Sequence, residues 1–189
     1  MKSSTAMIQP LTKEQQQQVS EHTHRYIKKA EGLFNLKKKA VEINFDIKGR
    51  TAGMYRVSHH LFQKKREIRY NPYIFSKYFD DNYEITVPHE VAHYVTDIMF
   101  GLKNIKPHGK EWKAVMQAFG SDATVTSNYD LTGIPVKRLS LFTYQCDCRE
   151  HQLSSIRHNK IRKHRYRYYC NVCKKSLHYK QTPQTGTAI

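Results

Sequence analysis

The 189-residue chain lacks any apolar run that approaches the roughly 18 residues of a membrane-spanning helix. No apolar segment of the kind found in secretory signals follows its first five residues. Cysteine is also scarce, with four in the chain, too few to suggest a scaffold built on disulfides. We therefore expect a cytoplasmic protein with no membrane partner, whose cysteines bind metal rather than form disulfides.

Acidic residues are few, because 16 Asp and Glu face 32 Lys and Arg and leave a formal net charge of +16. Residues 137–180 hold 12 basic and 2 acidic residues, whereas residues 1–136 hold 20 and 14. A basic surplus of this size favours a polyanionic partner, nucleic acid before anionic membrane. The length and this charge distribution predict a main domain over 1–136, a basic module over 137–181 and a flexible tail over 182–189.

The motif His89-Glu90-Val91-Ala92-His93 is the H-E-x-x-H arrangement of zinc peptidases. On a helix, His89 and His93 lie four residues apart on one face and can bind the same metal ion. Glu90 lies beside that face, where it can take a proton from a water on the metal. Asp97 follows on the same face, and we expect it to accept the second ring N–H of a ligating histidine. The alternative, a surface helix with two unrelated histidines, leaves the matched spacing unexplained.

A catalytic zinc usually has three protein ligands and one open position. His108 and Glu111 are the two candidates for the third ligand, and both stand at the start of an expected short helix. We favour His108 because neutral imidazole is the commonest metal ligand in proteins. Glu111 stays open as the alternative, because a carboxylate can also be the third ligand of a catalytic zinc. If Glu111 is not a ligand, we expect it to be an acid near the helix N-terminus that the helix dipole favours. We expect Trp112 to be an ordinary core residue.

The rest of the main domain predicts helices around a small sheet. Alternating apolar residues predict three short strands, in residues 41–47, 51–57 and 67–71. Short turns favour antiparallel pairing of these strands, and Gly53 marks a bulge or a close backbone approach. Thr12 with Gln15 resembles a capping box that opens the first helix. Pro88 either begins the motif helix or kinks a longer one.

The four cysteines form two close pairs, Cys146-x-Cys148 and Cys170-x-x-Cys173. Two such pairs separated by 21 residues predict a zinc ribbon with one structural ion. The first pair is tighter than usual, so a site in which His151 replaces one cysteine stays open.

Basic residues and tyrosines alternate between the two cysteine pairs. The candidate nucleic-acid-binding residues are Arg157, Lys160, Arg162, Lys163, Arg165, Arg167 and Tyr168. Cations neutralise phosphates while aromatic faces stack on unpaired bases, so we expect binding to DNA with single-stranded character. The alternative is a solvated charged face, with tyrosines on strands that pack the ribbon. The run Lys64-Lys65-Arg66 either extends this patch or serves solubility.

Several segments in this order resemble the SprT family, whose eukaryotic relatives include the Spartan proteases. The similar segments are Thr51-Ala52-Gly53, Ile68-Arg69-Tyr70-Asn71-Pro72, Pro88 to His93, Pro107 to Lys113 and the cysteine-containing tail, spanning roughly residues 15–180. The resemblance implies a compact zincin-type core, a continuous helix through Pro88, zinc on His89, His93 and His108, and Glu90 as general base. It also implies association with DNA and, in the Spartan branch, cleavage of proteins covalently trapped on DNA.

Together these observations predict an α+β zinc metallopeptidase domain followed by a basic zinc ribbon, with one catalytic and one structural Zn²⁺. The expected substrates are proteins already bound to DNA. The main alternative is a non-catalytic DNA-binding zinc protein, an accessory factor or a transcription-associated regulator, in which both zinc sites are structural.

Overall fold

The computed structural model describes residues 7–60, 63–123, 129–136 and 140–180. The chain divides into two compact units, residues 1–136 and 137–189, and each is described by itself. The expected tail over 182–189 lies outside the described residues.

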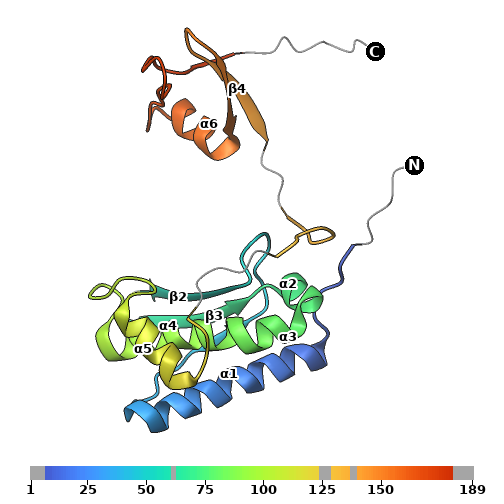
Figure 1. Ribbon diagram of the computed structural model, residues 1–189, viewed down its shortest axis with the longest axis vertical. Helices are drawn as coiled ribbons and strands as arrows, with labels where there is room; N and C mark the ends of the chain where they lie inside the picture. Colours follow the sequence, from blue (N-terminus) through green and yellow to red (C-terminus); the bar gives the residue numbers. More distant parts are fainter. Residues whose placement is uncertain (1–6, 61–62, 124–128, 137–139, 181–189) are drawn as a thin grey trace. The chain divides into compact units, whose positions relative to one another are not determined.

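The first unit combines helices with one three-stranded sheet, so the expected α+β class is confirmed (Figure 1). Its elements are α1 (Lys13–Phe34), β1 (Glu42–Asn44), β2 (Gly53–His60), β3 (Gln63–Tyr70), α2 (Pro72–Lys77), α3 (Phe79–Asp81), the π-helical turn η1 (Asn82–Thr86), α4 (Val87–Phe100) and α5 (Lys110–Phe119). No helix in the described part of the chain is long and apolar enough to span a bilayer.

Helix α1 begins at the predicted capping box. The Thr12 hydroxyl accepts from the Gln15 N–H at 3.2 Å, and the Gln15 side chain accepts from the Thr12 N–H at 3.0 Å. The helix ends at Asn35, whose left-handed backbone (φ 47°) is typical of a C-cap. Its buried residues are Val19, Thr23, Ile27 and Ala30, and the helix contacts both α4 and α5.

Strand β3 lies at the centre of the sheet, between β1 and β2. Strands β2 and β3 form the expected antiparallel pair, with Gly53 opposite Tyr70. The expected antiparallel pairing is wrong for β1, which runs parallel to β3 with Ile43 opposite Ile68. The chain after β1 continues along β3, where the Ile47 N–H donates to the Tyr70 carbonyl at 3.2 Å. Alternation therefore identified side chains that pack against the core, such as Ile43, Phe45 and Ile68, but it does not reveal the direction of a neighbouring strand.

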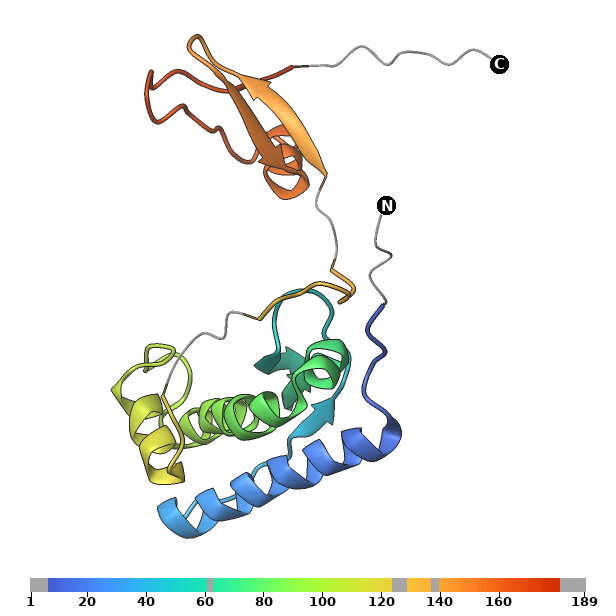
Figure 2. The same cartoon turned by 45° about the vertical axis from the view of Figure 1, so that its right-hand side comes forward.

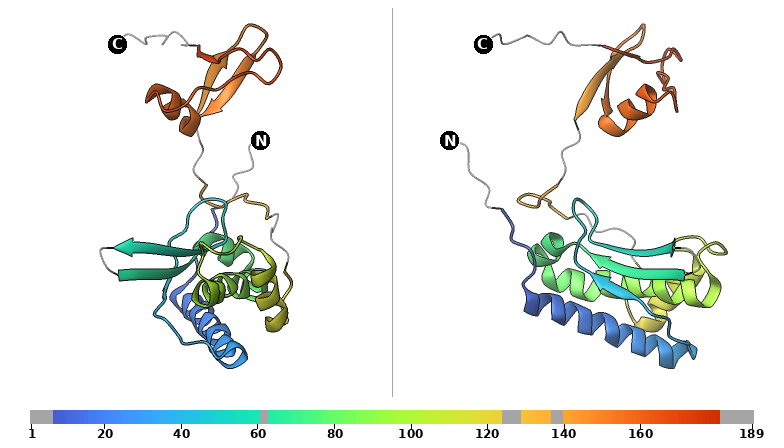
Figure 3. Two further views of the ribbon diagram at one scale, coloured as in Figure 1. Left: turned by 90° about the vertical axis from the view of Figure 1, so that its left-hand side faces the viewer. Right: turned by 180° about the vertical axis from the view of Figure 1, so that it is seen from behind.

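Helix α4 is the central element of the first unit. Figures 1 and 2 show it between the sheet and α1, and α5 also contacts it. It is therefore buried on several sides, through Val87, Val91, Ala92, Tyr94 and Val95 among others. The left view of Figure 3 shows β2 and β3 extending side by side beyond the helices. A helix held by so many neighbours is a rigid support for functional side chains.

The helical run that contains α4 is continuous through Pro88. Proline has no N–H to offer the carbonyl four residues earlier, which belongs to Glu84. The preceding turn, η1, widens to π-helical bonding, in which the Val87 N–H donates to the Asn82 carbonyl. Of the two readings that periodicity left open, the chain therefore adopts the longer helix.

The second unit is a small three-stranded sheet with one helix. Its elements are β4 (Leu141–Gln145), β5 (Glu150–Ser154), α6 (Ser155–Arg162) and β6 (His178–Tyr179), with β4 central and antiparallel to both neighbours. His158 belongs to its core, because the ring stacks on Phe142 at 3.8 Å and its Nδ1 lies 3.0 Å from the Tyr144 hydroxyl. The same core contains the buried Leu153.

Candidate metal centres and cleft

Three histidine side chains converge at one end of α4. His89 and His93 lie on the same face of the helix, with their Nε2 atoms 3.3 Å apart. His108 precedes α5 in a left-handed conformation (φ 55°), and its Nε2 lies 3.0 Å from each of the other two. The structure thus brings the helical pair together with the first of the two candidates for a third ligand.

Hydrogen bonding alone does not account for this triangle of nitrogens. An Nε2 atom either carries a proton and donates, or lacks one and accepts. Among three such atoms at least two share the same state, so at least one short contact sets two lone pairs or two N–H groups against each other. A shared cation removes that conflict. Zn–N distances of about 2.0–2.1 Å in a tetrahedral site place the nitrogens about 3.3–3.4 Å apart, close to the spacing observed.

The protonation states of these rings also suit a metal. Burial lowers the pKa of His89 to about 4 and that of His93 to about 3, and neighbouring histidines add to both decreases. Burial lowers the pKa of His108 as well. The rings are therefore neutral at physiological pH, and neutral imidazole is the form that binds metal.

Trp112 supports all three rings, which the sequence alone did not indicate. Its ring centroid lies 4.7 Å from that of His89, 5.7 Å from that of His93 and 4.8 Å from that of His108. Its Nε1–H donates to the His89 carbonyl at 3.3 Å. Trp112 is buried as expected, but it also fixes the histidine cluster. Its place three residues after Gly109, in the segment Pro107 to Lys113 that resembles the family, was a sequence signal that could have indicated this role.

Glu90 faces a cleft of about 390 Å³ that the three histidines also line. Its side chain is almost fully buried, and burial raises its pKa to about 8, an increase that the main-chain N–H of Tyr55 opposes. A cation beside the carboxyl group would also oppose this increase, because an opposite charge favours the ionised form. The arrangement can thus move a proton close to neutral pH.

Gly53 lets β2 approach this carboxylate closely, the second of the two roles that the sequence left open. A Cβ at Gly53 would lie 2.6 Å from Cγ2 of Thr86 and 2.8 Å from both Cγ and Oε1 of Glu90. Since both neighbours are buried on the central helical run, neither can move freely.

We expect Gly53→Ala to lower the free energy of unfolding of the first unit by about 1–3 kcal/mol, the usual cost of overpacking. Trp112, the single tryptophan, reports this unit in urea unfolding followed by fluorescence. Gly32→Ala is the matched control, because a Cβ there meets nothing within 4 Å and the helix interior favours alanine by about 1 kcal/mol. Equal stability of Gly53→Ala and the parent would contradict the close approach.

Glu111 is not among the convergent groups. The described residues contain two clusters whose ligand atoms lie within 4.8 Å of one another, and one consists of His89, His93 and His108. The carboxylate of Glu111 instead lies beside Gly109, where an added Cβ would be 3.3 Å from its Oε2.

The prediction that Asp97 accepts the ring N–H of a ligating histidine is wrong. Its Oδ2 accepts from the Tyr55 hydroxyl and from Nε of Arg66, each at 2.9 Å, and its Oδ1 accepts from Nζ of Lys64 at 2.8 Å. Asp97 therefore joins α4 to the β2–β3 hairpin and does not hold a histidine ring. One carboxylate thus pairs with two cations of the run Lys64-Lys65-Arg66, and whether this run extends a nucleic-acid patch stays open. Sequence spacing gave the face of the helix but not the hairpin that covers it.

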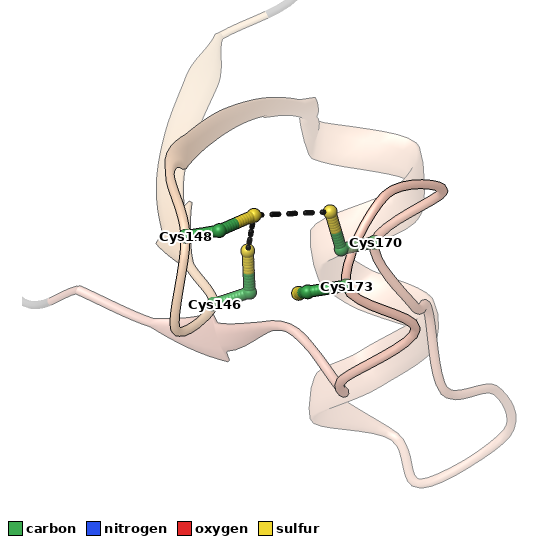
Figure 4. A group of neighbouring side chains, drawn as sticks. All are labelled: Cys146, Cys148, Cys170 and Cys173. Atoms are coloured by element: carbon green, nitrogen blue, oxygen red, sulfur yellow. Dashed lines mark hydrogen bonds between the residues drawn. The ribbon is translucent and has the colours of Figure 1, made fainter.

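The second cluster contains the four cysteines, which come from two loops and point their sulfur atoms toward a common centre (Figure 4). All four are free thiols, so the disulfide alternative is not adopted. The Sγ of Cys148 lies 3.5 Å from that of Cys146 and 3.7 Å from that of Cys170. A tetrahedral zinc with Zn–S bonds of about 2.3 Å requires sulfur separations of about 3.8 Å. The donors thus fit one zinc ion.

His151 lies next to this cluster, with Nε2 3.3 Å from the Sγ of Cys146. The hydrogen bond to Cys146 is the main cause that raises the pKa of His151. Four sulfur atoms already converge on one centre. The contact is therefore what we expect if the His151 ring hydrogen-bonds to the ligand Cys146 without binding the ion itself. Replacement of a cysteine by His151 stays open.

The candidate nucleic-acid-binding residues lie on α6 and on the segment that follows it. Arg157, Lys160 and Arg162 belong to α6, whereas the tyrosines follow it, and Tyr169 forms an isolated β-bridge with Ser176. The alternative reading, a solvated charged face with tyrosines on strands that pack the ribbon, stays open. The Arg157 guanidinium lies 5.7 Å from the centroid of the Tyr168 ring. None of the six cations forms an ion pair with another residue in the described part of the chain. Tyr166 and Tyr169 are each 57% exposed nearby.

Comparison with known proteins agrees with the motifs. Residues 16–138 match the model of the SprT-like family. Protein SprT of Glaesserella parasuis serovar 5 is 34% identical over 161 residues, covering 85% of this chain and 96% of the relative. Protein SprT of Vibrio parahaemolyticus is 34% identical over 138 residues, covering 72% and 77%. Protein SprT of Pasteurella multocida is 31% identical over 161 residues, covering 85% and 91%. No solved structure matches.

The family match spans the helical histidine pair, the glutamate between them and the third convergent histidine. The relatives named above match across most of their own length as well as most of this chain. From sequence and site together, this chain belongs to the SprT-like family.

Proposed function

We propose that the chain is a zinc-dependent endopeptidase, with a zincin-type catalytic unit, that cleaves proteins associated with DNA. The observation that carries this proposal is the triangle of neutral imidazole nitrogens beside a buried carboxyl group in an open cleft. A purely structural zinc site needs neither a general base nor an open face.

The residues divide the chemistry among them. His89, His93 and His108 would hold the zinc, and Trp112 keeps their rings in place. Zinc held there would supply Lewis acidity, which would lower the pKa of water toward about 7 and polarise the scissile carbonyl. Glu90 takes the proton of the attacking water and then delivers it to the leaving amine, so that the peptide bond is exchanged for a carboxylate and an amine.

The second unit supplies the proposed link to DNA. The four cysteines would bind a structural zinc on which the small ribbon depends for folding. Six cations without an ion pair among the described residues, interleaved with exposed tyrosines, suit a single strand, whose phosphates and unstacked bases they can contact together. Such a surface would bring the peptidase to proteins that already lie on DNA.

The function is tested by proteolysis of a DNA-bound protein by the full chain, with and without single-stranded DNA. We expect cleavage that disappears when a chelator removes zinc, returns when zinc is added back, and increases when the DNA is single-stranded. If the zinc-loaded chain binds DNA but cleaves nothing under any of these conditions, the non-catalytic alternative is correct.

DNA binding by the ribbon is tested by charge reversal. We expect Arg165→Glu to weaken binding of single-stranded DNA. The slope of log K against log salt, which is negative, should become less negative by about one. Fluorescence anisotropy across a salt series measures both quantities. The matched control is Lys28→Glu, an exposed position on α1 with the same change of charge, which we expect to alter binding only slightly. Equal effects of the two variants would contradict a specific role for the ribbon.

A further inference from the structure

The cleft is lined by apolar side chains as well as by the groups of the proposed reaction. The apolar side chains, called here the wall residues, are Met54 of β2 and, from the loop after α4, Leu102, Ile105 and Pro107. The same cleft is lined by the three histidines, Glu90 and the buried Trp112. The wall residues therefore share one cleft with the groups that would perform the reaction.

Two of these wall residues are exposed to solvent. Met54 is 40% exposed and Leu102 is 41% exposed, although the chain as a whole is polar, with a mean hydropathy of −0.75. Apolar side chains that converge on a cleft while still facing water are typical of a ligand site, whereas a single exposed apolar residue has no such meaning.

The cleft has few charged side chains, which favours an uncharged side chain as its occupant. Among the described residues that line the cleft, Lys106 is the only basic one apart from the histidines, and Glu90 is the only acidic one. A cleft of about 390 Å³ lies within the usual range of roughly 300–1,000 Å³ for ligand pockets.

Strand β2 lies at the edge of its sheet, with β3 as its single strand neighbour among the described residues. An extended segment can therefore lie along the cleft.

We propose that the cleft selects peptide segments that place a large apolar side chain, such as Leu, Met or Phe, against the wall residues Met54, Leu102 and Ile105. The selection rests on the proposed peptidase function, since the selected residue would lie next to the scissile bond. Apolar side chains of this size are mostly buried in folded proteins, so the cleft would favour exposed or frayed segments of a substrate.

The test measures binding separately from cleavage. The full chain with Glu90→Gln is loaded with zinc and titrated with Gly-Ser peptides that differ in one central residue: Leu, Ser, Lys or Asp. We expect the Leu peptide to bind at least about tenfold more tightly than the other three, as judged from the discrimination that apolar pockets achieve. Met54→Ser and Leu102→Ser, each added to this variant, should reduce the preference to less than about threefold. Leu33→Ser, at a 51% exposed position on α1 outside the cleft, should preserve it.

The outcomes are distinguishable from failure of the proposed function. Tighter binding of the Leu peptide that depends on Met54 and Leu102 supports the inference, even if the parent chain cleaves none of the peptides. Equal affinity for all four peptides, no binding of any, or tighter binding of a charged peptide overturns it. A preference that survives both wall substitutions overturns it too, as does a concentration-dependent dimer that both wall substitutions dissolve, because a second copy would then be the occupant.

Discussion

Glu90→Gln is expected to abolish measurable proteolysis while the chain keeps its zinc and its affinity for DNA. The amide has nearly the shape of the carboxylate, but it cannot accept the proton of the attacking water. Loss of a positioned general base typically lowers a rate by roughly 10²–10⁴-fold. Because the three histidines and the four cysteines are untouched, the chain should still contain two zinc ions.

The measurement is the cleavage rate of a DNA-bound protein, with zinc content determined on the same sample. Glu84→Gln is the matched control, since Glu84 is an exposed acid earlier in the same helical run and should leave the rate unchanged. A Glu90→Gln chain that cleaves as fast as the parent would remove Glu90 from the mechanism.

Replacement of His108 is the second change with a large expected effect. We expect His108→Ala to lose the zinc of the first unit, leaving one ion per chain, and to lose proteolysis with it. Glu111→Ala should keep both ions and most of the activity, because its carboxylate lies beside Gly109 and outside the histidine triangle. Its expected cost is about 0.3–1 kcal/mol of stability from the helix dipole.

The left-handed backbone at His108 requires a further control. Asparagine tolerates positive φ better than alanine does, so His108→Asn separates loss of the ring from strain in the loop. Loss of the ion in both variants identifies the imidazole as a ligand. Full zinc occupancy and activity in the His108 variants would show that another group binds the metal.

Local signals in the sequence predicted much of the first unit. The capping box at Thr12 and Gln15 depends on residues three apart, and the structure contains both of its hydrogen bonds. The pairing of His89 with His93 depends only on the pitch of a helix. Such features are readable from sequence because neighbours along the chain determine them.

Features that depend on distant segments were harder to predict. The choice between His108 and Glu111 depends on how the loop before α5 returns to α4. The partners of Asp97 come from β2 and β3, about 31–42 residues away, and they replaced the expected histidine. The parallel direction of β1 likewise follows from the path of the chain between strands, on which alternation carries no information.

The most direct test is a crystal structure of the zinc-loaded chain with anomalous diffraction measured at the zinc edge. The account predicts a zinc ion about 2.0–2.1 Å from the Nε2 atoms of His89, His93 and His108, with its remaining position open to the cleft beside Glu90. Rings that point away from one another in the zinc-loaded crystal, or an ion enclosed by four protein ligands, would contradict it.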